Sequence, residues 1–189
     1  MINQLQDQIS QFKNIVEENQ SFVIISHNKP DGDTLGANFA LRLSLLNQGK
    51  KVTSACFDKM PEKLTFLPES QNLTQDFLLE DFDAIIIVDT GAKHLVSHFE
   101  KYPELNRTKK PIIIIDHHYS VEDFGTIKII DSKATSTTSL LLEMFESLNW
   151  DITPDMATCL LNALKHKYKS TKTSSKTWKI GSKIQTNPN

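Results

Sequence analysis

The sequence predicts an α/β fold, a mostly parallel five-stranded sheet flanked by helices. Three aliphatic runs, at 22–26, 84–88 and 112–115, are apolar at nearly every position, which is typical of strands buried on both faces of a parallel sheet. Segments with helical spacing of apolar residues alternate with these runs, and that alternation favours right-handed βαβ crossovers. Each run also stops at acidic or imidazole side chains, at the sheet edge where ligands collect in folds of this kind.

The predicted elements follow one another along the whole chain. Strands are expected at 22–26, 52–56, 84–88, 112–115 and 127–130. Helices are expected at 2–16, from about 34 to 48, around 95–99, from 135 or 136 to 148, and from 154 onward. The stretch 61–68 has a proline at each end, so we expect a turn-rich connection there with room for one short helical turn.

Each helix has its own sequence signal. The N-terminal helix shows apolar residues spaced three and four apart, which indicates an amphipathic helix. The second helix stops at Gly49, a residue typical of helix C-termini. Thr135 or Ser136 can cap the helix that follows the fifth strand, and Pro154 suits the first turn of the last helix.

Composition narrows the class of protein. At 189 residues the chain can bury a core and holds one domain comfortably. Its 39% hydrophobic and 23% charged residues are ordinary for a globular protein, and no apolar stretch approaches membrane-spanning length. The first residues carry neither a basic region nor an apolar run, so we expect no signal peptide. Cys56 and Cys159 lack metal or redox spacing, which favours a reducing cytoplasm.

Seven ionisable residues are predicted to meet at the carboxyl-terminal edge of the sheet. They are His27, Asp31, Asp33, Asp89, Asp116, His117 and His118. Four carboxylates and three imidazoles in one place would repel one another and lose hydration unless cations neutralised them. Carboxylate and imidazole ligands suit Mn²⁺, Mg²⁺ or Zn²⁺, and oxygen-rich sites favour Mn²⁺ or Mg²⁺. The sequence therefore predicts a divalent-metal site, with Gly32 allowing the two flanking aspartates to face one pocket.

Several of these residues have a second interpretation. Asp31 and Asp33 can also be turn and N-cap residues of the helix that follows. Asp116 is better placed to orient a ligand than to bind a metal. His117 can bind a metal, and His118 can contact a phosphate or orient a ligand. We therefore assign Asp116 and His118 to the catalytic residues and the other five to the metal ligands.

Other polar residues are interpreted more simply. His94 and His98 are spaced like a metal pair on a helix, but no Glu lies between them and no third ligand is evident, so we expect surface histidines. The Thr/Ser run at 135–139 is expected to start a helix, with phosphate contact as the alternative. Asn28 and Lys29 lie in the predicted metal loop, where solvent exposure and substrate contact are both open.

Three segments resemble the first three motifs of the DHH phosphoesterase family. They are His27-x-x-x-Asp31-x-Asp33, Val88-Asp89-Thr90-Gly91 and Asp116-His117-His118. The most similar branch is the oligoribonuclease and pAp-phosphatase type, which is related to RecJ-like nucleases. The likeness runs from the N-terminal helix to about Ala163, and 134–138 and 152–157 also resemble family sequence.

The resemblance implies two Mn²⁺ ions, with Mg²⁺ as the alternative metal. His27, Asp31 and Asp89 would hold one ion. Asp33, Asp89 and His117 would hold the other. Two such ions about 3.5–4 Å apart activate a water and stabilise the phosphoryl group that it attacks. The implied function is hydrolysis of phosphate esters of short oligonucleotides or of 3′-phosphorylated nucleotides such as pAp, with no membrane partner.

The sequence departs from the family pattern after Ala163. Family members continue with a glycine-flanked Asp-Thr-Gly loop, whose Asp is a further ligand of the second ion. Here Leu164 follows directly and no Asp occurs after Asp155. We also expect the family's C-terminal substrate-binding domain to be absent. These departures predict impaired hydrolysis; the alternative is an inactive or truncated fragment that binds metal or nucleotide.

The charge distribution sets the expected end of the domain. The net charge is −2, yet seven lysines and no acidic residue follow Asp155. We expect residues 1–164 to form the DHH domain and 165–189 to be a basic C-terminal tail or a remnant of the same domain. Such a tail is either a solvated segment or a cationic arm near a phosphate-bearing substrate.

Overall fold

Six parallel strands form one sheet in a computed structural model that describes residues 2–167. The strands are β1 (Ser21–Ser26), β2 (Lys51–Cys56), β3 (Leu73–Thr74), β4 (Ala84–Val88), β5 (Ile112–Asp116) and β6 (Ile127–Ile130). Every neighbouring pair is parallel. The five predicted strands are confirmed. The sixth, β3, was not predicted because its two residues are too short to show a hydrophobic period.

Five α-helices flank the sheet within residues 2–167. They are α1 (Ile2–Glu18), α2 (Gly32–Asn47), α3 (His98–Lys101), α4 (Thr137–Leu148) and α5 (Pro154–Lys167). The helix predicted around 95–99 is shorter than expected. It consists of a 3₁₀ turn at Lys93–Leu95 and the single turn of α3. Pro103 explains the early end, because it cannot donate a helical hydrogen bond and it disfavours helical dihedrals at Tyr102.

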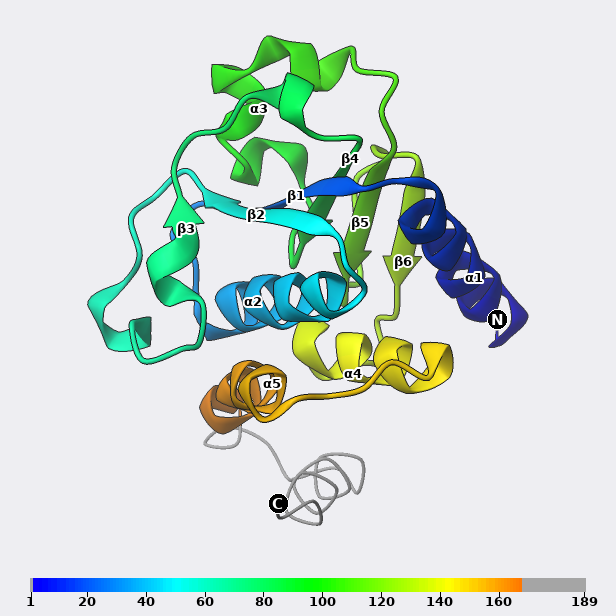
Figure 1. Ribbon diagram of the computed structural model, residues 1–189, viewed down its shortest axis with the longest axis vertical. Coiled ribbons are helices and arrows are strands. Elements are labelled where there is room, and N and C mark those ends of the chain that lie inside the picture. Colours follow the sequence, from blue (N-terminus) through cyan, green and yellow to red (C-terminus); the bar gives the residue numbers. More distant parts are fainter. Residues whose placement is uncertain (1, 168–189) are drawn as a thin grey trace.

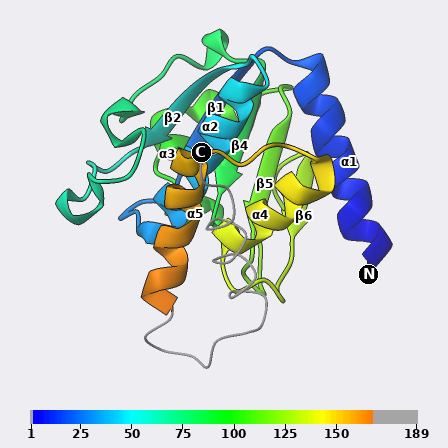
Figure 2. The ribbon, with the colours of Figure 1, turned by 60° about the horizontal axis from the view of Figure 1, so that its bottom comes forward.

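The helices and the loop segments cover opposite faces of the sheet. Side chains alternate between the faces along each strand. Phe22, Ile24 and Ile86 belong to the core under α1, α2, α4 and α5, whereas Val23 and Ile85 belong to the core under α3 and its flanking segments. Figure 1 shows α2, α4 and α5 on one side of the sheet and α3 on the other, with α1 beside β6. Figure 2 brings α2, α4 and α5 in front of the strands.

Helices α2 and α5 approach each other closely at Gly36. A side chain added at Gly36 would place its Cβ 2.5 Å from the backbone oxygen of Cys159 and 3.3 Å from Cγ2 of Thr138. Only a glycine therefore permits this contact. It holds α5 and the start of α4 against the N-terminal half of α2, which carries Asp33 and is capped by Asp31.

The strand order β3-β2-β1-β4-β5-β6 reverses direction between β1 and β4. In doubly wound sheets, the crevice beyond the carboxyl ends of the strands at such a reversal is where ligands bind. His27 follows β1 and Asp89 follows β4. The topology therefore brings two of the predicted metal ligands to the two sides of this crevice.

Within the described residues, none of the helices has the length and apolar character that crossing a bilayer requires. Residues 165–167 of the predicted tail continue α5. The rest of that tail, 168–189, lies outside the described residues.

Candidate metal centre

The chain leaves β4 through an unusual backbone conformation at Asp89. Its φ of 58° lies in the left-handed region, which Asp tolerates better than most residues. The N–H of Asp89 donates to the carbonyl of Ile115 at 2.9 Å, so the turn is fixed to the end of β5. A buried carboxylate thus stands at the reversal of strand order, between the ends of β1 and β5.

The first group of candidate ligands is His27, Asp31 and Asp89. One ligand atom from each lies within 4.8 Å of the others, and Nε2 of His27 is 3.8 Å from Oδ2 of Asp89. Nδ1 of His27 lies 2.7 Å from the carbonyl of Asn28. Because that carbonyl can only accept, Nδ1 keeps its proton in the neutral ring as well as in the charged one, so Nε2 is the nitrogen that a metal would use once it has lost its own proton.

The charged forms of His27 and Asp89 stabilise each other. Burial lowers the pKa of His27, but the hydrogen bond and the negative charge of Asp89 outweigh it, and the pKa is raised overall. Burial raises the pKa of Asp89, but hydrogen bonds from His27, Thr34 and Thr137 lower it more strongly. Asp89 is therefore a carboxylate at neutral pH, the form that binds a cation.

Asp31 has a structural role as well as its place in the first group. It is the N-cap of α2, and its Oδ1 accepts from the N–H groups of Asp33 at 2.9 Å and Thr34 at 3.0 Å. The N-cap interpretation of Asp31 is therefore confirmed. The two interpretations are compatible, since a capping carboxylate keeps its second oxygen.

The second predicted group is Asp33, Asp89 and His117; the ligand atoms that lie within 4.8 Å of one another there belong to Asp89, His117 and His118. Nε2 of His117 is 3.6 Å from Oδ2 of Asp33 and 3.8 Å from Oδ1 of Asp89. Asp33 is no N-cap; it lies inside α2 and accepts from the N–H groups of Thr137 at 3.1 Å and Thr138 at 3.0 Å. The start of α4 thus fixes Asp33, and Asp89 faces one histidine with each of its oxygens.

Two threonines contact the shared carboxylate, and the sequence reasoning did not identify either. Thr34 donates to Oδ2 of Asp89 at 2.7 Å, and Thr137 donates to Oδ1 at 2.8 Å. Thr34 also contacts Nε2 of His27. The expected helix start at 135–139 is confirmed, with Ser136 as N-cap in a capping box. The hydroxyl-rich sequence there was the available signal, but only the fold brings it to Asp89.

Asp116 and His118 form a separate pair beside the two groups. Asp116 is fully buried, and its Oδ1 lies 2.7 Å from Nδ1 of His118 and 2.8 Å from the N–H of His117. Its Oδ2 has no hydrogen-bond partner among the described residues. His118 is half exposed, and one of its ring nitrogens lies within 4.8 Å of a carboxylate oxygen of Asp89 and a ring nitrogen of His117. This geometry suits both predicted roles of His118, contacting a phosphate and orienting a ligand.

The prediction of two surface histidines at 94 and 98 was half wrong. His94 is exposed, beside Glu122. His98 is fully buried, and its Nε2 lies 3.0 Å from the carbonyl of Gln75. Rings of Phe57, Phe77 and Tyr102 lie 5.3–6.0 Å from it. The spacing of His94 and His98 describes one helix face only, whereas the Phe77 segment that covers His98 is distant in sequence.

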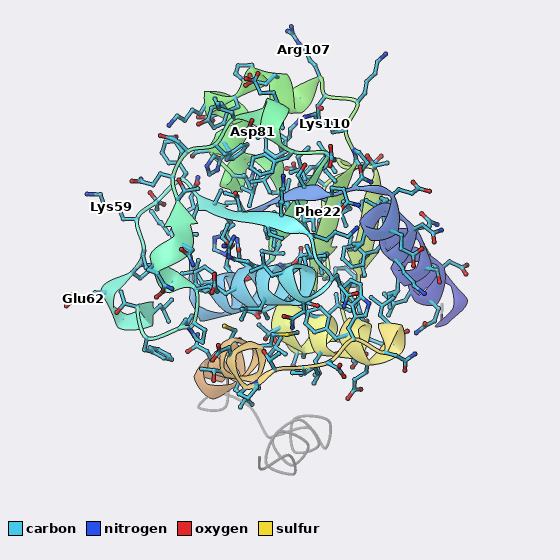
Figure 3. The ribbon with its side chains drawn as sticks, in the orientation of Figure 1. Phe22, Lys59, Glu62, Asp81, Arg107 and Lys110 are labelled. Atoms are coloured by element: carbon cyan, nitrogen blue, oxygen red, sulfur yellow. The ribbon has the colours of Figure 1, made fainter. Side chains whose placement is uncertain are left out.

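Two cavities, of about 390 and 460 Å³, lie away from this centre and share the lining residues Leu79 and Glu104. Lys110 lines one of them and precedes β5, so both are at the amino-terminal end of the strands. Figure 3 shows Lys110 and Arg107 at the end of the molecule away from α4 and α5. We therefore identify the site by the chemistry of its candidate ligands.

The ligand set fits a hard divalent cation. It consists of carboxylate oxygens and imidazole nitrogens, the ligands that Mn²⁺ accepts and that oxygen-preferring Mg²⁺ shares in part. Cys56 is close, but its thiol faces the carbonyl of His27 at 3.4 Å and burial raises the pKa of that thiol to about 11. Cys56 belongs to neither group of candidate ligand atoms, which are carboxylate oxygens and imidazole nitrogens.

Comparison with known proteins agrees with this arrangement. A model of the DHH family, N-terminal domain, matches residues 21–164. The bifunctional oligoribonuclease and PAP phosphatase NrnA of Mycoplasma genitalium is 25% identical over 155 residues, which cover 80% of this chain and 48% of that protein. A probable bifunctional oligoribonuclease and PAP phosphatase NrnA of Streptococcus mutans is 24% identical over 137 residues, covering 70% and 41%. The chain thus spans about half the length of the curated relatives that it matches.

Solved structures show the same fold. An exopolyphosphatase-related protein from Bacteroides fragilis superposes with a TM-score of 0.86 at 25% identity, covering 95% of this chain and 56% of that one. The exonuclease RecJ bound to manganese superposes with a TM-score of 0.55 at 15% identity, covering 94% and 46%. At that identity RecJ shows the fold alone.

Proposed function

This chain belongs to the DHH family, and on that premise we propose that it is a metal-dependent phosphoesterase. Its proposed substrates are short oligoribonucleotides or 3′-phosphorylated nucleotides such as pAp. The relatives named as oligoribonuclease and PAP phosphatase support this substrate class. The observation that carries the proposal is the position of Asp89, whose two oxygens face one histidine each at 3.8 Å.

We propose that the centre binds two divalent ions and that it prefers Mn²⁺ to Mg²⁺. The first would be held by His27, Asp31 and Asp89. The second would be held by Asp33, Asp89 and His117, the set in which His117 lies within 4 Å of both carboxylates. When bound, such ions act as Lewis acids that lower the pKa of water and neutralise charge on a phosphoryl group.

The residues of the chain prepare this centre for a phosphate. Thr34 and Thr137 hold the carboxylate of Asp89 from both sides, so its orientation does not have to be established when ligand binds. Asp116 holds Nδ1 of His118, which leaves Nε2 of a half-exposed ring to contact a phosphate oxygen. We propose His118 as the phosphate contact and Asp116 as the residue that orients it.

We propose that turnover is slow. Helix α5 runs without a break from Pro154 to Lys167, through the point at which the resemblance places the family's Asp-Thr-Gly loop. The second ion would therefore lack one carboxylate, which weakens a hard-cation site and the positioning of the reacting groups. The same observation supports the second candidate function, a protein that binds metal and nucleotide without hydrolysis.

Hydrolysis of pAp and of a short oligoribonucleotide tests the proposal. We expect slow hydrolysis that needs Mn²⁺ and is lost in Asp89→Asn, which keeps the side-chain volume. The exposed acid Asp151 provides the matched control, because Asp151→Asn leaves the proposed ligands intact. Mn²⁺-dependent nucleotide binding without hydrolysis would favour the second candidate function. Neither binding nor hydrolysis would contradict both.

We place the proposed activity in the cytoplasm. Cys56 and Cys159 are free and buried, and thiols of this kind are usual in a reducing compartment. A mononucleotide or short oligonucleotide would be the partner in that compartment.

A further inference from the structure

Tyr119 is the most exposed large hydrophobic residue in the part of the chain that the structure describes. It follows His117 and His118 directly, and 95% of its surface is accessible. The other exposed large hydrophobic residues are less accessible: Leu46, Phe57, Phe66, Leu78 and Leu95. Among residues 2–167, Tyr119 makes no described hydrogen bond or ring contact. An aromatic ring in water is free to contact a ligand, and this one follows two candidate site residues in the chain.

The backbone that carries Tyr119 is anchored on both sides. Before it, Asp116 accepts from His118 at 2.7 Å. After it, the N–H of Glu122 donates to the carbonyl of Gly91 at 2.8 Å, and the carboxylate of Glu122 accepts from the N–H of Lys93 at 2.9 Å. The loop that carries the ring is therefore held by hydrogen bonds on both sides of Tyr119.

Gly91 allows the loop after β4 to approach the loop after β5 closely. A Cβ at Gly91 would lie 2.7 Å from the carbonyl oxygen of Ser120. The loop after β4 and the loop after β5 are thus in direct backbone contact. Because Asp89 begins the first loop and His117 the second, the backbone at Tyr119 is held near both metal groups.

The separation also suits a nucleotide. Tyr119 lies two residues beyond His117, so their Cα atoms are at most about 7 Å apart. A nucleotide bound through its phosphate has its base one sugar away from the metal centre, within reach of a tyrosine side chain. Bases stack on aromatic side chains with little regard to sequence, because every base offers a π-face.

We propose that Tyr119 is a platform on which the nucleobase of the substrate stacks. The inference rests on the proposed function and defines its substrate class further. The site would prefer phosphates that carry a nucleobase over sugar phosphates, with little preference among the bases.

The experiment compares two ligands that differ only in the base. Equilibrium binding of AMP and of ribose 5-phosphate is measured by calorimetry with Mn²⁺, for the full chain and for Tyr119→Ala and Tyr119→Phe. Phe66→Ala is the matched control, because Phe66 is also an exposed aromatic residue, at 63% accessibility, in the connection between β2 and β3. Thermal melting checks that each variant is folded.

We expect Tyr119→Ala to weaken AMP binding by about tenfold and to leave ribose 5-phosphate binding unchanged. Tyr119→Phe and Phe66→Ala should bind both ligands as the wild type does. Unchanged AMP binding by Tyr119→Ala, or an equal loss for both ligands, would overturn the platform and leave the proposed function intact. Failure of the wild-type chain to bind either ligand would overturn the proposed function, and the platform with it.

Discussion

The hydroxyl of Thr137 donates a hydrogen bond of 2.8 Å to Oδ1 of Asp89, and so joins the first turn of α4 to the end of β4. Thr34 donates to the other oxygen at 2.7 Å from the first turn of α2. Two helix starts therefore fix the plane of one buried carboxylate. This relationship matters because Asp89 is the one proposed ligand that both metal groups share.

Thr137→Val should weaken Mn²⁺ binding by about tenfold, since groups that orient metal ligands typically contribute that much or more. Valine keeps the shape of threonine and removes only the hydroxyl that Asp89 accepts from. Free Mn²⁺ measured by electron paramagnetic resonance during a titration gives the affinity. Thr158→Val on the exposed side of α5 is the control. Equal affinity in Thr137→Val and wild type would show that the hydroxyl does not orient the ligand.

The fold was predictable because strands that are buried on both faces are apolar at nearly every position. Strands β1, β4 and β5 are aliphatic at nearly every position, and the acidic or imidazole residues at their ends located the site. The ends of the strands meet because the sheet is parallel, so three separate sequence segments implied one centre.

The parts that escaped prediction all depend on tertiary contacts. Thr34 and Thr137 lie far apart in sequence and contact Asp89 only after α2 and α4 dock. Asp33 was interpreted from its own turn, but its partners lie about a hundred residues away, at the start of α4. His98 was judged by its spacing to His94, and no local pattern reports the Phe77 segment that buries it.

Gly36→Ala should destabilise the protein by about 1–3 kcal/mol. The added Cβ would lie 2.5 Å from a backbone oxygen of α5, and backbone cannot move aside as a flexible side chain can. Urea unfolding followed by circular dichroism measures the loss. If Gly36→Ala unfolds at the wild-type urea concentration, the close approach of α2 and α5 is not present in solution.

His98 should make the protein less stable as the pH falls below about 6.5. Burial lowers the pKa of His98, the charge of Lys101 lowers it further, and the hydrogen bond to Gln75 and the charge of Asp76 oppose this. The unfolded chain, whose histidine has a pKa near 6.5, therefore binds a proton that the folded chain resists. The stability present above pH 6.5 is lost progressively as the pH falls towards the lower, folded-state pKa.

Urea unfolding at pH 7.5 and pH 5.5 measures this effect. The decrease in unfolding free energy between the two pH values should be smaller in His98→Phe, where the new ring fits among Phe77 and Tyr102. His94→Gln is the control, because His94 is exposed and should leave the decrease as in the wild type. An unchanged decrease in His98→Phe would assign the pH dependence to other groups.

Mn²⁺ binding should separate into two classes of affinity. The group His27, Asp31 and Asp89 has its full proposed ligand set, whereas the group with His117 lacks the further carboxylate that the family resemblance implies. Fewer anionic oxygens mean weaker binding of a hard cation. His27→Ala should therefore remove the tight class, His117→Ala the weak class, and Asp89→Asn should weaken both. The opposite assignment of the two histidines would show that the missing loop does not limit the second ion. Retention of both classes in Asp89→Asn would show that the carboxylate is not shared.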